Sequence, residues 1–338
     1  MMKGNLEPSS SSSSQRPPSC LFALTTTAEL GGAIARAMGQ PLAAHEERSF
    51  EDGEHKVRPL GNVAGADVFV LQSLHGGPSE SANDKLCRLL FFIGALRDAG
   101  AARVTAITPY LAYARKDRRT KPNDPVTTRY VAQMFEAVGT DRVVTLDVHN
   151  PVAFENAFRC PTVTLTATPL FVDYVRALNE EHLCVVSPDT GGAKRAEFFR
   201  ESLETALGRQ IGKGFADKHR SAGVVSGDLF VVAGATALII DDLISTGNTL
   251  LRAAKAARRA GATRVLAFVT HGLFIAGAAD VIADPALDRL IVTDAVPAFR
   301  LKDDTARQKV DVLAVAPLFA EAIERLRRGS ALTDLLVI

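Results

Sequence analysis

Short runs that are apolar at every position alternate with stretches of helical periodicity along most of this chain. The apolar runs cover residues 68–71, 104–107, 143–146, 184–186, 237–240 and 265–269. A strand with one solvated face alternates apolar and polar residues, so these continuous runs predict strands covered on both faces. The intervening periodicity predicts helices over 84–99, 127–138, 193–207 and 249–260. Strand and helix in alternation predict an α/β fold with mainly parallel sheets.

A short pattern occurs twice along the chain. Arg97-Asp-Ala-Gly-Ala-Ala-Arg-Val104 and Arg258-Arg-Ala-Gly-Ala-Thr-Arg-Val265 each end a predicted helix with glycine and enter a predicted strand. Such joints are common in α/β proteins, but the matching strand before each helix favours two related halves. We expect them to divide between Cys160 and Glu181. The predicted segments are a disordered Ser/Pro-rich tail (1–18), an N-terminal domain (19–165), a C-terminal domain (166–326) and a C-terminal segment (327–338).

Composition and charge limit the partners and the compartment that we expect for this protein. The chain has 338 residues, of which 39 are Lys or Arg and 38 are Asp or Glu, so its net charge favours neither nucleic acid nor a membrane surface as a partner. Its apolar runs are too short to span a bilayer, and no signal region is evident, so we expect a cytoplasmic protein. The cysteines lack metal-ligand spacing, and Cys87 and Cys184 lie in apolar runs, which predicts reduced core thiols.

The strongest candidate site follows the run that ends at Ile240. Asp241-Asp-Leu-Ile-Ser-Thr-Gly-Asn-Thr249 places two acids and then a turn rich in hydroxyls before a helix. Backbone N–H groups of such a turn and the positive helix terminus bind phosphate, while the two carboxylates can accept hydrogen bonds from sugar hydroxyls. Asn248 is the non-glycine residue that best tolerates a positive φ. This pattern predicts a sugar-phosphate site.

Other segments carry charged residues beside predicted strands. Arg48-Ser-Phe-Glu-Asp-Gly-Glu54 is, by its chemistry alone, a surface turn. Pro109-Tyr-Leu-Ala-Tyr-Ala-Arg-Lys-Asp-Arg-Arg119 contains most of the densest positive cluster, which either is solvated or holds a triphosphate. Thr145-Leu-Asp-Val-His149 and Ser187-Pro-Asp-Thr-Gly-Gly192 follow strands, at the sheet edge where α/β proteins bind ligands. Phe215-Ala-Asp-Lys-His-Arg220 places two cations on a loop near glycines.

The turn after Ile240 resembles the ribose-phosphate-binding loop of type I phosphoribosyltransferases and of ribose-phosphate pyrophosphokinases. The other segments resemble motifs of the pyrophosphokinases, in the same order and over residues 21–326. This resemblance implies two domains of the type I phosphoribosyltransferase kind, each a mostly parallel sheet flanked by helices. It also implies an enzyme that transfers a diphosphate from ATP to ribose 5-phosphate, with Mg²⁺ as cofactor. The expected assembly is a homo-oligomer built from dimers, either a dimer or a hexamer.

The resemblance also implies roles for single residues. ATP would be bound by Phe50, Asp52, Gly53, Glu54, Arg115 and Lys116, the first four across a subunit interface. Ribose 5-phosphate would be bound by Arg220, Asp241, Asp242, Ser245, Thr246, Gly247, Asn248 and Thr249. Lys218 and Arg220 would be catalytic, and His149 and Asp189 would bind the metal. Asp147 is expected to orient the His149 imidazole, because alternation along a strand would put both on one side.

Two alternatives stay open. A type I phosphoribosyltransferase acting on a base needs only the turn after Ile240 and leaves the ATP-like segments unexplained. The second alternative is a non-catalytic regulatory relative. Damaged catalytic positions would favour it, but the four expected residues are all present: Lys218, Arg220, His149 and Asp189.

Overall fold

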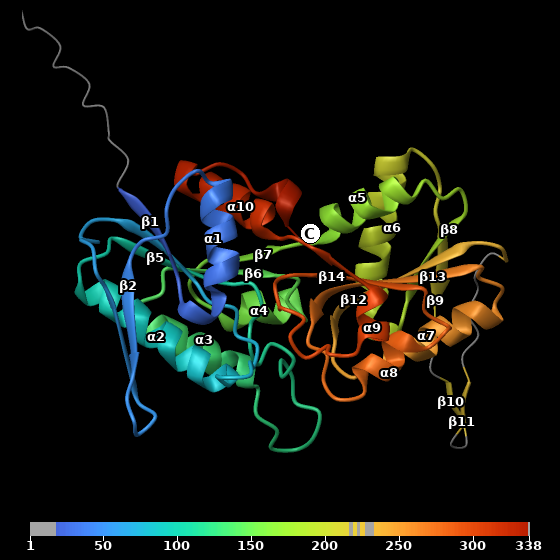
Figure 1. Ribbon diagram of the computed structural model, residues 1–338, viewed down its shortest axis with the longest axis horizontal. Helices are drawn as coiled ribbons and strands as arrows, with labels where there is room; N and C mark the ends of the chain where they lie inside the picture. Colours follow the sequence, from blue (N-terminus) through green and yellow to red (C-terminus); the bar gives the residue numbers. More distant parts are fainter. Residues whose placement is uncertain (1–17, 216–218, 222–223, 227–232, 337–338) are drawn as a thin grey trace, which may run out of the picture.

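The computed structural model describes residues 18–215, 219–221, 224–226 and 233–336, and it consists of two α/β halves (Figure 1). The N-terminal half is built on a parallel sheet of five strands in the order β1-β4-β5-β6-β7. These are β1 (Ser19–Ala23), β4 (Asp67–Leu71), β5 (Arg103–Thr108), β6 (Arg142–Leu146) and β7 (Thr162–Leu165). Its helices are α1 (Ala28–Ala37), α2 (Ala82–Asp98), α3 (Thr127–Ala137) and α4 (Pro151–Ala157).

The C-terminal half has a parallel sheet of six strands, in the order β15-β14-β13-β12-β8-β9. They are β8 (Leu183–Ser187), β9 (Gly212–Phe215), β12 (Thr236–Ile244), β13 (Arg264–Gly272), β14 (Arg289–Thr293) and β15 (Val310–Leu313). The helices of this part of the chain are α5 (Thr168–Leu178), α6 (Ala193–Leu207), α7 (Asn248–Arg259), α8 (Ala278–Ala283), α9 (Asp304–Gln308) and α10 (Ala316–Arg328).

These elements confirm the predicted α/β fold with two parallel sheets flanked by helices. Each predicted strand lies within β4, β5, β6, β8, β12 or β13, and the predicted helices correspond to α2, α3, α6 and α7. Nearly every residue of these strands is buried, as expected for strands covered on both faces. The prediction of core thiols was wrong for Cys87, whose side chain is exposed on α2.

The repeated joint has the same hydrogen bonds in both halves. Gly100 and Gly261 have φ values of 86° and 97°, and both follow the last turn of a helix. Arg97 binds the carbonyls after Gly100 and the carboxylate of Asp141, which also accepts from the backbone N–H of Val104 at 2.7 Å. In the other half, Arg258 and Asp288 make the equivalent bonds, with the N–H of Val265 at 2.6 Å. The two halves are therefore built on one structural pattern.

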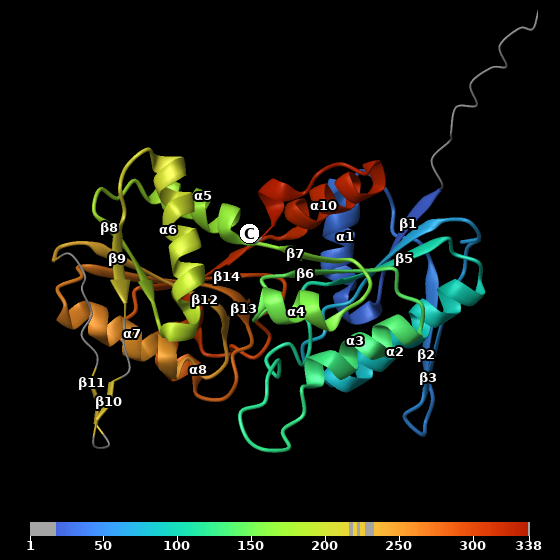
Figure 2. The ribbon, with the colours of Figure 1, turned by 180° about the vertical axis from the view of Figure 1, so that it is seen from behind.

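Three apolar clusters hold the helices on the sheets. One lies between the first sheet and α2 and α3, and another between the second sheet and α7 and α8. The third is continuous through both halves and includes side chains of α1, α5, α6 and α10. Although α10 follows the second sheet along the chain, it packs beside α1 on the first sheet, as Figures 1 and 2 show from opposite sides. The predicted domain boundaries stay a prediction, but the last helix of the predicted C-terminal domain packs on the N-terminal half.

Among the residues that the structure describes, no helix is both long and apolar enough to cross a membrane.

Candidate active site

The turn after β12 has the geometry of an anion-binding site. β12 extends through Asp241 and Asp242 to Ile244, and α7 begins at Asn248. Gly247 lies between them with φ 83°, and a Cβ added there would come within 2.7 Å of Val281 Cγ1. The positive φ thus falls on Gly247, whereas Asn248 is already the first helical residue, so the tolerance expected of Asn248 is not used. N–H groups of the first helical turn have no partner within a helix and can bind phosphate oxygens.

Both halves contribute to a cluster of charged residues next to this turn. The carboxylate Oδ2 of Asp242 lies 2.6 Å from Nδ1 of His149, which follows β6 of the other half. Arg195, in the first turn of α6, lies 3.1 Å from Asp241 Oδ1 and 3.4 Å from Asp242 Oδ1. His149 and Asp242 line a cavity of about 10 Å³ together with Arg115. The structure therefore brings together residues predicted separately for the metal, the sugar and ATP.

The partner expected for His149 was wrong. β6 ends at Leu146, and Asp147 has φ 37°, so the alternation of side chains along a strand does not extend to Asp147. Its carboxylate accepts from the backbone N–H of Ala167 at 3.0 Å and from the hydroxyl of Thr270 at 2.6 Å. Asp147 thus joins the two halves, and Asp242 orients the imidazole.

The surroundings of the two neighbouring carboxylates shift their pKa values in opposite directions. Burial, reinforced by the charge of Asp242, raises the pKa of Asp241 to about 8. Burial acts in the same direction on Asp242, but the hydrogen bond from His149 and the charge of Arg195 hold its pKa well below the usual range. The hydrogen bond to Asp242 in turn raises the pKa of His149, against the effect of burial. The same environment therefore drives the two neighbouring acids in opposite directions, raising the pKa of Asp241 and lowering that of Asp242.

The residues predicted to bind ATP lie in two places. Arg115 and Lys116 belong to the loop between β5 and α3, and Arg115 lines the same small cavity as His149. The ammonium of Lys116 is 2.6 Å from Oδ2 of Asp124, and this bond is the main reason why the pKa of Asp124 lies below its usual range. Lys116 is thus held within its own loop, whereas Arg115 has no ion pair among the described residues.

Phe50, Asp52, Gly53 and Glu54 form the tip of a hairpin. Its antiparallel strands are β2 (His45–Ser49) and β3 (His55–Pro59), and the turn is closed by a hydrogen bond of 2.8 Å from Phe50 N to Glu54 O. The Phe50 ring is 40% exposed, with the Arg48 guanidinium 5.0 Å from its centroid. The hairpin projects from the outer end of the N-terminal half (Figures 1 and 2), and among the described contacts none joins its tip to the His149 cluster.

The predicted catalytic loop is only partly described. Lys218 lies outside the described residues. Arg220 lies in β10 (His219–Ser221), where it pairs with Val225 of β11 (Val224–Ser226).

The two residues predicted for the metal each present an atom that can bind a cation, although none of the described contacts joins them. In the neutral imidazole, the Nδ1–H of His149 donates to Asp242 and leaves the lone pair on Nε2; a histidine that binds a metal is commonly oriented by a carboxylate in this way. Asp189 is half-buried at the start of a short 3-10 turn (Thr190–Gly192), where Oδ1 accepts from the N–H of Gly192 at 3.1 Å. Its other oxygen can bind a cation. Among the described residues, no group of three or more His, Cys, Asp or Glu is arranged as a metal site.

Two residues of the site were missed by the sequence analysis. Arg195 carries a positive charge into the first turn of α6, where the helix dipole disfavours a cation, and this was a usable signal. His271, the penultimate residue of the buried strand β13, lines the small cavity, with Nε2 2.9 Å from the carbonyl oxygen of Leu146 in the other half. Its place at the ligand-binding edge of a sheet could have identified it.

Comparison with known proteins identifies the family. The chain matches the family model of the N-terminal domain of ribose phosphate pyrophosphokinase over residues 19–139, and that of the phosphoribosyl synthetase-associated domain over residues 212–337. It is 36% identical over 322 residues to the ribose-phosphate pyrophosphokinase of Ralstonia nicotianae, covering 93% of this chain and 97% of that one. It is 34% identical over 320 residues to that of Wolinella succinogenes, covering 94% and 98%.

A solved structure agrees with the sequence relatives. The crystal structure of phosphoribosylpyrophosphate synthetase from Mycobacterium smegmatis matches with a TM-score of 0.82 and 32% identity, over 93% of this chain and 100% of that one. The fold, the order of the motifs and these relatives agree, and the chain belongs to the ribose-phosphate pyrophosphokinase family of enzymes.

Proposed function

We propose that this enzyme transfers the β,γ-diphosphate of Mg-ATP to the C1 hydroxyl of ribose 5-phosphate, giving 5-phosphoribosyl 1-diphosphate and AMP. The observation that carries the proposal is the cluster in which His149 of one half meets Asp242 of the other, beside the turn 245–249 and a cavity that Arg115 also lines. A sugar phosphate seated on the turn would lie next to a cation site and to Arg115, which has no ion pair within the described part of the chain.

The turn supplies the seat for ribose 5-phosphate. Ser245, Thr246 and Thr249 offer hydroxyl donors, and the N–H groups around Gly247 and Asn248 complete the phosphate site. Asp241 and Asp242 face the sugar. In its protonated form, which the raised pKa favours, the Asp241 carboxyl group would donate to one sugar oxygen and accept from another hydroxyl.

The chemistry is an in-line displacement at phosphorus. The C1 hydroxyl oxygen of ribose 5-phosphate attacks the β-phosphorus and gives up its proton to solvent, while the bond from that phosphorus to the α,β-bridging oxygen breaks and AMP leaves with that oxygen. Arg115 would bind the triphosphate, and Lys218 and Arg220 would neutralise the charge that develops on the transferred group. Magnesium, held by His149 and Asp189, would offset the charge of the phosphates. Positioning and electrostatics then account for the rate enhancement.

The hairpin of Phe50, Asp52, Gly53 and Glu54 would serve the site of a neighbouring subunit. Its aromatic tip is exposed and lies at the far end of its own half, so it is available to a neighbour's nucleotide. Exposed apolar side chains of α2 and α3, including Phe91 and Tyr130, are also available for contact between subunits. We therefore infer a homo-oligomer based on dimers. A cytoplasmic location is proposed from the family resemblance alone.

An assay of AMP formation tests the proposal. AMP should appear only when ATP, ribose 5-phosphate and Mg²⁺ are all present, and the assay should be run with and without inorganic phosphate. ADP formation that does not depend on ribose 5-phosphate would contradict the proposal. Consumption of 5-phosphoribosyl 1-diphosphate that requires a base and no ATP would favour a phosphoribosyltransferase. Absence of turnover, together with binding to an active pyrophosphokinase, would favour a regulatory relative.

A further inference from the structure

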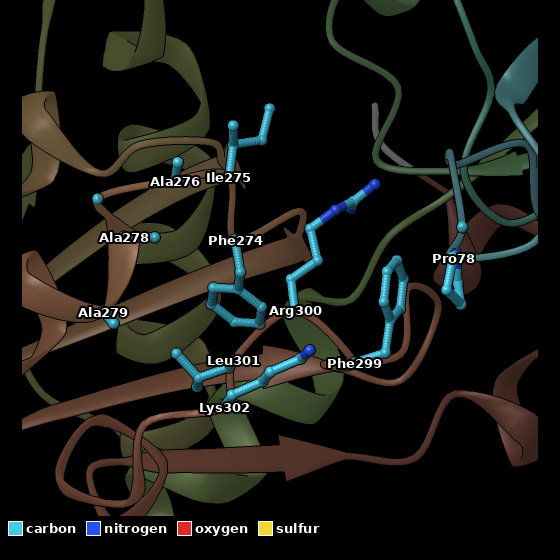
Figure 3. Close-up of a pocket in the computed structure, with 12 residues that line it drawn as sticks. Pro78, Phe274, Ile275, Ala276, Ala278, Ala279, Phe299, Arg300, Leu301 and Lys302 are labelled. Atoms are coloured by element: carbon cyan, nitrogen blue, oxygen red, sulfur yellow. The ribbon is translucent and has the colours of Figure 1, made fainter.

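A second, larger pocket lies between the two halves and shares no lining residue with the small cavity at His149. Its volume is about 490 Å³, within the range typical of sites for small molecules. Gly77 and Pro78 line it from the N-terminal half, and the segments 274–279 and 299–302 line it from the C-terminal half. Figure 3 shows the ring of Phe274 and the side chain of Leu301 on one side of the pocket and Pro78 on the other. The pocket therefore has apolar walls.

The charged residues that line this pocket are both cations. Arg300 and Lys302 extend toward the side on which Pro78 lies (Figure 3), and neither forms an ion pair within the described part of the chain. The Arg300 guanidinium donates to two neutral acceptors, the carbonyl oxygens of Gly76 at 2.6 Å and Leu273 at 3.0 Å. Its positive charge is therefore not neutralised by a carboxylate.

A third cation, Lys85, lies next to Gly77, which lines the pocket. Lys85 is 1% exposed, and a Cβ added to Gly77 would be only 3.6 Å from its ammonium nitrogen. The atom within hydrogen-bonding distance of that nitrogen is Nε2 of His75, at 3.5 Å. The nearby Glu80 carboxylate is already paired with Arg88 at 3.0 Å. A buried ammonium without a direct carboxylate partner is unfavourable, and an anion in the adjoining pocket would reduce that cost.

We propose that this pocket binds a small organic anion, a phosphate or carboxylate joined to an apolar body. Arg300 and Lys302 would bind the anionic group through charge-assisted hydrogen bonds, and Phe274 and Leu301 would contact the apolar body. None of the residues that line the pocket is among those assigned above to ATP, ribose 5-phosphate or the metal. The backbone N–H of Ile275, a lining residue, donates to the carbonyl oxygen of Ser245 at 3.0 Å, so this site adjoins the phosphate-binding turn without sharing its residues.

The absence of tryptophan from the chain allows a direct test. In a Phe299→Trp variant, all tryptophan fluorescence would come from the pocket. Phenyl phosphate should produce a saturable change in this signal while ribose 5-phosphate is present at saturation. Inorganic phosphate and phenol should each bind at least about tenfold more weakly, because each offers only part of the chemistry. A Lys302→Glu change in the same background should weaken phenyl phosphate binding by about tenfold or more.

Matched controls make the result decisive. Arg259→Glu makes the same change of charge on the exposed side of α7, in the same half, and should alter the affinity less than about twofold. Calorimetric titration of the unmodified chain with phenyl phosphate repeats the measurement without the reporter. The proposal is overturned by the lack of saturable binding, by equal affinity in the Lys302→Glu variant, or by displacement of phenyl phosphate by ribose 5-phosphate.

Discussion

The carboxylate of Asp242 pairs with His149 and Arg195, and Asp242 is almost completely buried. Asp242→Asn keeps the shape of the side chain but removes the charge that orients His149 and pairs with Arg195. Because these groups would act on the developing charge of the reaction, we expect kcat for AMP formation to fall by about 10²–10³-fold.

The control for this change is Asp280→Asn, which removes an exposed carboxylate from α8 and should leave kcat unchanged. Wild-type kcat in the Asp242 variant would show that the His149 contact is structural only.

Substitutions of Lys218 and Asp241 should affect different quantities, kcat in the first case and the affinity for ribose 5-phosphate in the second. If Lys218 acts only as charge develops, Lys218→Ala should lower kcat by about 10²–10³-fold and leave the affinity for ribose 5-phosphate nearly intact. Asp241→Ala should instead weaken ribose 5-phosphate binding, because the sugar hydroxyls lose a partner. Steady-state kinetics and calorimetry of both variants test this. A raised KM with unchanged kcat in the Lys218 variant would mean that the loop only holds the substrate.

His75 should make stability depend on pH. Burial, helped by the charge of Lys85, lowers the pKa of His75 from 6.5 to about 4. Between these values the unfolded chain binds the proton and the folded one does not, so stability is lost as the pH falls from about 6.5 toward 4. The loss attributable to His75 is up to about 3 kcal/mol.

Urea denaturation at pH 7 and pH 4.5 measures this loss. His75→Gln should reduce the difference between the two pH values, and His182→Gln, at an exposed position, should not. Identical pH dependence in all three proteins would contradict the assignment.

At the scale of elements, the turn from β12 to α7 depends on one glycine. Gly247→Ala would force a side chain into a positive φ and within 2.7 Å of Val281. Gly208 also has a positive φ, but a Cβ there would meet nothing within 4 Å. We expect Gly208→Ala to cost about 1–2 kcal/mol of unfolding free energy, and Gly247→Ala to cost more and also to raise the KM for ribose 5-phosphate. Equal losses of stability, with no change in KM, would show that the close approach has no functional role.

The strands and main helices were predictable because burial on both faces leaves a local pattern. The repeated joint at Gly100 and Gly261 was also predictable from a local pattern, because the left-handed conformation at the end of a helix favours glycine. The partner of His149 was not predictable from such patterns. His149 and Asp242 are 93 positions apart in different halves, and periodicity contains no information on how two sheets are placed together. The assignment to Asp147 failed because a strand was assumed to continue past its end at Leu146.

On the scale of the whole molecule, activity should require assembly. If the Phe50 hairpin completes a neighbour's site, an isolated monomer should be inactive, and so should Phe50→Ala and Lys218→Ala proteins when assayed separately. Chains of the two variants, mixed and allowed to exchange, can form a site with a native hairpin and a native loop. About a quarter of wild-type activity should return for random dimers.

Sedimentation at the assay concentration provides the second measurement. A fully active monomer, or no recovery after demonstrated exchange of subunits, would refute a shared site.

The packing of α10 on α1 has a consequence for biosynthesis. On a ribosome, α1 emerges early and α10 only after both sheets have been translated, yet the two helices belong to one apolar cluster over the first sheet. Leu335 also reaches back to this sheet, accepting a hydrogen bond of 2.9 Å from the N–H of Thr166. The nascent N-terminal half therefore presents an uncovered apolar face throughout most of translation, a state in which chaperones bind and aggregation begins.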